Sequence, residues 1–122
     1  MSAIRSHRDL VVWQKGMDLV TEVYRLTQKF PDAERFGLVS QLRRASVSVP
    51  SNIAEGYGRG YTADYIRFLR SSRGSLYEID TQLLIAARLG FIAQSDYEGI
   101  LERINECGRM LAALIRTLNE KE

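Results

Sequence analysis

The chain has 122 residues, enough for one domain with a conventional hydrophobic core and too few for two. Its net charge is only +2, and no run approaches the roughly 20 apolar residues that span a bilayer. Cys107 is the single cysteine, which excludes an intramolecular disulfide and a zinc site built from several cysteines. The N-terminus lacks the pattern of a signal peptide. These features predict one cytoplasmic domain over residues 1–122, without membrane association.

The first periodic segment follows a short N-terminus, residues 1–9, that we expect to be flexible. Asp9 is a candidate N-cap, because its carboxylate can accept hydrogen bonds from the free N–H groups of the next turn. Two apolar rows with helical spacing then follow: they consist of Val12, Leu19, Val23, Leu26 and Phe30, and of Trp13, Met17, Val20 and Tyr24. Pro31 and Asp32 predict a turn after this helix.

The second segment is predicted to be a helix from about Glu34 to Gly58. Its apolar row recurs at spacings of three, four and seven and consists of Phe36, Val39, Leu42, Val49 and Ile53. Pro50 lies inside it and removes one hydrogen bond to the carbonyl of Ser46. Since the apolar row stays in phase on both sides of Pro50, we expect one kinked helix rather than two. The hydroxyls of Ser46 and Ser48 can help to satisfy the freed backbone groups.

The third and fourth segments complete the fold. Thr62 is a candidate cap for a helix whose heptad row is Tyr65, Leu69, Ser72, Leu76, Ile79, Leu83 and Ala86. Within it, Gly74 and its serine neighbours predict close approach of another backbone, and Gly90 predicts a left-handed stop. Ser95 and Glu98 form a potential capping box before the row Tyr97, Leu101, Ile104, Gly108, Leu111, Ile115 and Leu118. Short connections then predict an all-α, antiparallel up-and-down four-helix bundle with a proline-kinked second helix.

Groups that could support catalysis or metal binding are few. His7 is the only histidine and precedes the first helix, and Cys107 lies beside the apolar row of the fourth. Glu55, Glu78 and Asp80 are better explained by ion pairs with arginines than by a metal site. The Gly56–Gly60 stretch lacks the strand and the lysine of a phosphate loop. The sequence therefore predicts a protein that is not an enzyme and needs no cofactor or metal.

Positive charge is concentrated in the middle of the chain. Residues 35–73 carry seven arginines against Glu55 and Asp64, whereas residues 74–122 carry five basic and eight acidic groups. Arginines interleaved with tyrosines suit phosphate contacts and base stacking. The nucleic-acid-binding candidates are Arg43, Arg44, Arg59, Arg67, Arg70 and Arg73, with Tyr57 and Tyr61 as stacking residues. The alternative is that these arginines pair with the acidic fourth helix, within the chain or across a subunit boundary.

Several motifs carry a resemblance to a known family. They are Asp9-Leu10, the stretch 12–15 (Val-Trp-Gln-Lys), the long string 41–59 within the second helix, Tyr65, Phe68, Leu69, Gly74-Ser75 and Glu78. With these motifs the chain resembles the bacterial four-helix-bundle family named for proteins encoded in 23S rRNA intervening sequences. Pro50, Asn52 and Glu55 belong to the hallmark string, and we expect them to have a structural or subunit-contact role.

This resemblance implies an antiparallel four-helix bundle that assembles as a homopentameric ring and associates with RNA. A related branch, the accessory proteins of diversity-generating retroelements, works with a reverse transcriptase. The resulting prediction is a non-enzymatic, oligomeric RNA-binding protein. The alternative is a protein–protein scaffold or adaptor ring, for example for a reverse transcriptase or another polymerase.

Overall fold

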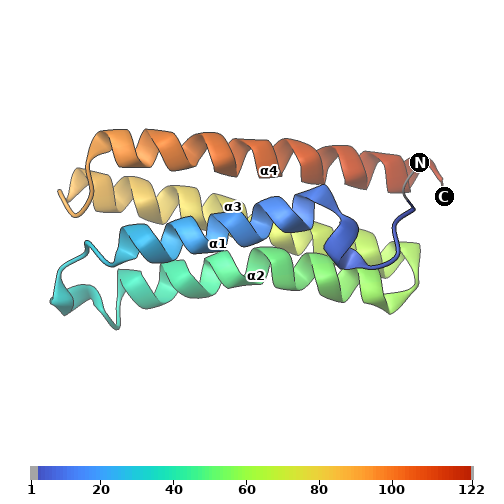
Figure 1. Cartoon of the computed structure of the whole chain (residues 1–122), viewed down its shortest axis with the longest axis horizontal. Coiled ribbons are helices and arrows are strands. Elements are labelled where there is room, and N and C mark those ends of the chain that lie inside the picture. Colours follow the sequence, from blue (N-terminus) through green and yellow to red (C-terminus); the bar gives the residue numbers. More distant parts are fainter. Residues whose placement is uncertain (1–2, 122) are drawn as a thin grey trace.

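A computed structural model describes residues 3–121, and four helices dominate them (Figure 1). The helices are α1 (Val11–Thr27), α2 (Leu38–Arg59), α3 (Thr62–Arg88) and α4 (Gln94–Glu120), with short 3-10 helices η1 (His7–Asp9) and η2 (Asp32–Glu34). Successive helices run in opposite directions, so that α1 begins and α4 ends at the same end of the molecule. The predicted antiparallel four-helix bundle is confirmed.

The core lies along the common axis of the four helices, and the predicted apolar rows supply most of it. The second row of α1 is the exception: Trp13 packs against the core, but Met17 and Tyr24 are exposed. Each helix packs against the next in sequence, and α4 packs back against α1, which closes the bundle. The side chains that exclude water completely come from all four helices: Leu19, Val23, Leu42, Val49, Ile53, Leu69, Ile79, Leu83, Ala86 and Leu111. Burial of this apolar surface is the main stabilising contribution to the fold.

Helix α2 continues without interruption through Pro50, as the in-phase apolar row predicts. Polar side chains supply hydrogen bonds around the proline. Ser72 Oγ donates to the carbonyl of Val49 at 2.7 Å, and Asn52 Nδ2 donates to that of Ser48 at 2.8 Å. Neither bond reaches the carbonyl of Ser46, which Pro50 leaves without its helical donor. The bond from Ser72 joins α3 to α2 beside the proline, and the hydroxyls of Ser46 and Ser48 donate to the carbonyls of Arg43 and Ala45. A kink at Pro50 stays a prediction.

The close approach of α2 and α3 is made by a different glycine from the one predicted. A Cβ on Gly56 would lie 2.7 Å from Phe68 Cβ, whereas a Cβ on the exposed Gly74 would meet nothing within 4 Å. Ser72 and Ser75 are the small residues that face α2, and both are buried. The assignment of close backbone contact to Gly74 was therefore wrong, because Gly74 lies on the outer face of α3.

Two predicted helix starts in the first half of the chain were also wrong. Asp9 accepts from the backbone N–H groups of Arg5 and Ser6, so it closes the turn of η1 and leaves Leu10 as the N-cap of α1. The second helix begins at Leu38 rather than near Glu34, because η2 and the turn that follows it separate Glu34 from the helix. Glu34 instead accepts from the N–H of Leu38 through Oε1 at 3.2 Å, which caps α2 from outside.

Of the predicted boundaries of α3 and α4, some are confirmed and others were wrong. Tyr61, not Thr62, is the N-cap of α3, while Asp64 lies in the first turn as predicted. At the other end, Gly90 has φ of +80°, as predicted, and the N–H of Phe91 donates to the carbonyl of Ala86 in a Schellman motif. Helix α4 begins after Ala93, so the expected capping box of Ser95 and Glu98 does not form.

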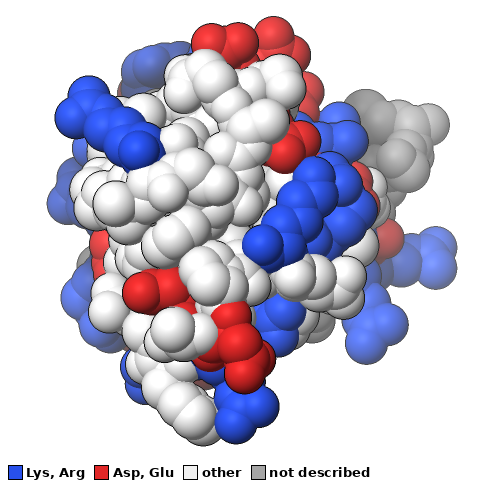
Figure 2. All heavy atoms as spheres, turned by 90° about the vertical axis from the view of Figure 1, so that its left-hand side faces the viewer, with Lys and Arg blue, Asp and Glu red and all other residues white. Residues whose placement is uncertain are grey.

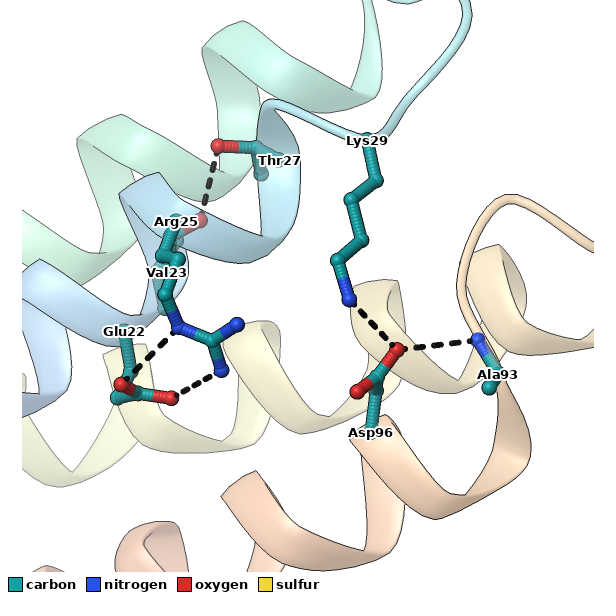
Figure 3. Close-up of polar contacts among 7 residues, drawn as sticks. All are labelled: Glu22, Val23, Arg25, Thr27, Lys29, Ala93 and Asp96. Atoms are coloured by element: carbon teal, nitrogen blue, oxygen red, sulfur yellow. Dashed lines mark hydrogen bonds and ion pairs between the residues drawn. The ribbon is translucent and has the colours of Figure 1, made fainter.

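A polar link fastens the end of α1 to the start of α4 (Figure 3). Asp96 accepts from Lys29 Nζ at 3.1 Å and from the N–H of Ala93 at 3.3 Å. The hydrogen bond from Lys29 is the main reason why the pKa of Asp96 lies below its ordinary value. Nearby, Arg25 and Glu22 form an ion pair at 2.9 Å on α1. These contacts fix the entry of α4 against a helix that is distant in sequence.

Candidate nucleic-acid interface

Two predicted arginines meet over one aromatic ring at the connection between α2 and α3. The guanidinium carbons of Arg59 and Arg67 lie 5.1 and 4.6 Å from the centroid of Phe68. Arg59 also pairs with Glu55 at 2.9 Å, and Arg67 pairs with Asp64 at 3.3 Å. Exposed ion pairs of this kind are worth only about 0–1 kcal/mol, so a phosphate can compete for both guanidinium groups.

The two predicted stacking tyrosines have different environments. Tyr61 precedes α3 and is 73% exposed, which leaves its ring open to a ligand. Tyr57 is half-buried and meets the ring of Tyr65 edge-on at 6.0 Å. Burial raises the pKa of Tyr65 to about 12, which marks the inner side of this tyrosine pair as apolar. We call Arg59, Tyr61, Arg67 and Phe68 the α2–α3 patch.

Arg70 and Arg73 continue along α3 beyond this patch. Both are exposed, and neither forms an ion pair with any residue between 3 and 121. Arg73 lines a groove of about 430 Å³ between α3 and α4, with Arg109 also on its lining. We call it the α3–α4 groove; its apolar lining includes Leu76, Ile104, Gly108 and Ala112, and Tyr77 lies beside them. Arg70 thus lies one helical turn beyond Arg67, between the α2–α3 patch and Arg73, which lines the groove.

Arg43 already has partners inside the bundle. Its Nε donates to Thr27 Oγ1 at 2.9 Å, its Nη2 donates to the carbonyl of Tyr24 at 3.4 Å, and its guanidinium carbon lies 4.4 Å from the Tyr24 ring. These contacts tie α2 to the last turn of α1. The neighbouring Arg44 is exposed and has no ion pair in the described part of the chain.

The predicted residues therefore do not form one surface. Arg44 and Arg59 are 15 positions apart on the same helix, which corresponds to roughly 22 Å along its axis. None of the ion pairs within residues 3–121 joins an arginine of the 35–73 segment to α4. Figure 2 shows the end with the α1–α2 and α3–α4 connections, where separate charged groups of both signs surround a broad uncharged area.

A second groove, between α1 and α2, contains residues that sequence reasoning placed elsewhere. Phe36 was predicted to be in the apolar row of the second helix, yet its side chain is 85% exposed. The prediction was wrong because the helix begins only after Gly37, so Phe36 does not share the register of Val39 and Leu42. The glycine directly after Phe36 was the signal that could have shown this. Phe36 lines the groove together with Tyr24, Arg35, Arg43, Arg44 and Val47.

Pro50, Asn52 and Glu55 make contacts within the subunit. Pro50 is buried against α1, where a Cβ on Gly16 would lie 3.5 Å from its Cβ. Asn52 donates to the Ser48 carbonyl and Glu55 pairs with Arg59. Each of the three residues thus has a partner within its own subunit, and their expected structural or subunit-contact role stays a prediction.

The single cysteine and the single histidine of the chain both lie against apolar or aromatic side chains. Cys107 is 1% exposed, as its place beside an apolar row predicts, and burial is the main reason that its pKa is raised to about 11. The His7 ring meets Trp13 edge-on at 5.1 Å. Residues 3–121 contain no cluster of three or more histidine, cysteine or acidic side chains that could hold a metal ion. Nor does any helix among them combine the length and apolarity needed to cross a bilayer.

Comparison with known proteins agrees with the motifs in the second helix. Residues 8–113 match the family model described as 23S rRNA-intervening sequence protein. The chain belongs to this family. Among solved structures, it is similar to a protein of unknown function from the S23 ribosomal protein family of Bacteroides thetaiotaomicron, with a TM-score of 0.80 at 23% identity. The similarity covers 87% of this chain and 96% of the other and confirms the fold. The comparison with curated proteins gave no match.

Proposed function

We propose that this member of the 23S rRNA-intervening sequence protein family is a non-enzymatic RNA-binding protein that works as a homo-oligomer. The observation that carries the proposal is the excess of arginine on α2 and α3. Arg44, Arg70 and Arg73 are exposed there without an acidic partner among the described residues, in a segment with seven arginines and two acids. Unpaired guanidinium groups fit phosphate, which they can bind through two parallel hydrogen bonds.

The α2–α3 patch, with Arg70 beside it, is the proposed RNA contact. Arg59 and Arg67 would exchange their weak pairs with Glu55 and Asp64 for phosphates, and Arg70 would add a third contact. Tyr61 is exposed enough to stack against a base. Because such contacts release counterions, RNA affinity is expected to fall steeply with added salt.

The test measures binding to structured RNA and to duplex DNA across a salt series. Replacing Arg67 and Arg70 with alanine should weaken RNA binding roughly 10-fold and lower the salt slope by about two, since two phosphate contacts are lost. The matched control replaces Arg103 and Arg116, two exposed arginines of α4, and should bind like the wild type. An RNA affinity that does not change with salt concentration would contradict the proposal. An equal loss of RNA affinity in both double variants would contradict it as well.

For self-association we propose the α3–α4 groove as a subunit contact. Its apolar lining and Tyr77, which is 67% exposed, offer surface that a second copy can cover. Arg73 and Arg109 in its lining fit acidic groups at the edge of such an interface, while Asp80, the one carboxylate that residues 3–121 contribute to the lining, accepts from the hydroxyl of Tyr97 at 2.6 Å. The predicted pentameric ring would repeat the RNA contact around an axis and raise the overall affinity through avidity.

The scaffold function is the second candidate, and the same groove favours it. A groove with an apolar lining and two arginines suits a protein surface with acidic margins as well as it suits a sister subunit. If an intact oligomer binds no RNA even at low salt, we expect a protein partner, such as a polymerase, to be the ligand.

A further inference from the structure

Phe36 is the most exposed large hydrophobic side chain among residues 3–121. It lies in a structured turn: the N–H of Gly37 donates to the carbonyl of Glu34 at 3.0 Å, and Glu34 Oε1 accepts from Leu38. The guanidinium carbon of Arg35 lies 4.8 Å from the centroid of the Phe36 ring. The ring is thus presented to solvent by an ordered backbone, with a positive charge beside it.

Phe36 lines one side of the α1–α2 groove, which has a volume of about 470 Å³. This volume is within the range of roughly 300–1,000 Å³ that is typical of small-ligand sites. Its apolar lining comes from Tyr24, Phe36, Val39 and Val47, and its cationic lining from Arg35, Arg43 and Arg44.

The lining of this groove is cationic and, in the part of the chain that the structure describes, contains no carboxylate. Of the acidic groups near it in sequence, Glu34 accepts from the N–H of Leu38 and Glu22 pairs with Arg25, and neither these two nor Asp32 lines the groove. Arg43 is fixed by hydrogen bonds to Thr27 and Tyr24, so one positive charge is held in place before any ligand binds. Arg44 is exposed beside it and free to reach a ligand.

We propose that the α1–α2 groove binds an unpaired nucleotide of the RNA, and this inference rests on the proposed RNA binding. The base would stack on Phe36 and pack against Tyr24, while Arg35 and Arg44 would contact its phosphates. Exposed aromatic rings beside arginines are the groups that hold splayed-out bases. An apolar helix would instead leave the three arginines desolvated without partners. A base-paired duplex cannot place a base face on Phe36 unless it unstacks.

The experiment compares an RNA hairpin that has an unpaired loop with a blunt duplex of the same stem. Phe36→Ala should weaken binding of the hairpin roughly 10-fold, because one base–aromatic stack is lost, and should leave duplex binding unchanged. Phe36→Trp should restore hairpin binding, because it keeps a stacking surface. Ultraviolet cross-linking of the hairpin followed by mass spectrometry should place a nucleotide on the peptide that contains Phe36.

Leu89→Ala is the control, because it removes another large apolar side chain that is 59% exposed and lies outside both grooves and the α2–α3 patch. It should change neither affinity. Unchanged hairpin binding by Phe36→Ala would overturn the inference and leave the proposed RNA binding intact. An equal loss of affinity for the hairpin and for the duplex would also overturn it, since the groove would then contact only the sugar–phosphate backbone of the RNA.

Three further outcomes separate this inference from the proposed function. A wild-type chain that binds neither RNA at low salt would overturn both. A Phe36→Ala chain with altered oligomer mass and normal RNA affinity would assign the groove to a second copy of the chain and overturn the nucleotide site. The third outcome is binding of poly-glutamate with an affinity that Phe36→Ala lowers as much as it lowers hairpin affinity. That result would assign the groove to an acidic protein partner and would also overturn the nucleotide site.

Discussion

At the scale of single residues, the fit between α2 and α3 depends on Gly56. A Cβ at this position would lie 2.7 Å from Phe68 Cβ and 3.2 Å from the carbonyl oxygen of Tyr65. Neither atom is the end of a flexible side chain, so the two helices themselves would have to separate. The glycine therefore permits a contact that no other residue type allows.

We predict that Gly56→Ala lowers the free energy of unfolding by about 1–3 kcal/mol, as overpacking of a well-packed core does. Helix propensity alone predicts the opposite sign, because alanine is more stable than glycine inside a helix by up to about 1 kcal/mol. Urea denaturation of the purified variant measures the change.

Gly74→Ala serves as the control for Gly56→Ala. Gly74 is an exposed helical glycine with nothing within 4 Å of the new Cβ, so only the helix preference acts there. We expect this variant to be at least as stable as the wild type. Equal destabilisation by the two substitutions would mean that steric contact at Gly56 is not the cause.

Phe36 and Arg43 show why candidate site residues are difficult to predict from sequence. Phe36 fits the apolar period of the second helix, but the backbone leaves the helix before reaching it. Arg43 has the side chain of a phosphate-binding residue, but it already donates hydrogen bonds to Thr27 and Tyr24, which lie 16 or more positions earlier in the chain. For Arg43 the deciding contacts are not local in sequence, whereas for Phe36 the deciding feature is the break at Gly37 next to it.

At the scale of elements, the end of α3 is determined by a left-handed residue. Gly90 has φ of +80°, and its N–H donates to the carbonyl of Ala87 at 3.1 Å. Nothing lies within 4 Å of a Cβ at this position, so a side chain there would not clash with a neighbour. Its only cost would be the strain of a left-handed backbone conformation. The chain reverses at Gly90 and leads into α4.

We predict that Gly90→Ala destabilises the fold by roughly 1–2 kcal/mol, since a left-handed conformation costs about that much for a residue with a Cβ. Thermal unfolding should therefore begin at a lower temperature, with the midpoint reduced by several degrees. Gly99→Ala, an exposed position inside α4 with free space around it, is the control and should not be destabilised. A Gly90→Ala midpoint equal to that of the wild type would show that the turn adapts without strain.

Element boundaries were predicted well where one residue dominates and poorly where they were assigned from capping side chains. Gly90 was predicted correctly because few residues other than glycine adopt positive φ without strain. Asp9, Thr62 and Ser95 all have the chemistry of an N-cap, yet none of them is an N-cap. The N-caps are Leu10, Tyr61 and Ala93, and none of these makes a side-chain capping hydrogen bond, so cap chemistry does not decide where these helices begin.

At the scale of the whole molecule, the α3–α4 groove tests the proposed self-association. Ala112 lies in the lining of this groove and is half-buried. We predict that Ala112→Glu weakens assembly at least 10-fold, because the larger side chain would fill the groove and its carboxylate would pair with Arg73 and Arg109, the groups that a second copy is proposed to bind. Mass measurements in solution over a range of protein concentrations would follow the change.

The control for assembly is Ala63→Glu, which places the same charge at an exposed position in the first turn of α3. It should leave the oligomer mass unchanged. A thermal-unfolding curve of the Ala112→Glu variant should show that its helices are intact. An Ala112→Glu chain that assembles like the wild type would exclude the α3–α4 groove as the subunit contact.

The sequence by itself determined the number and type of the elements, most of the core and the family. These properties follow from periodic apolar rows and from one long motif, and both are local patterns along the chain. Tertiary structure alone decided that Gly56 rather than Gly74 makes the close contact and that Arg43 is bound internally. The physical reason is that a side chain's partners come from whichever helix packs beside it, and periodicity does not say which residues of two helices meet.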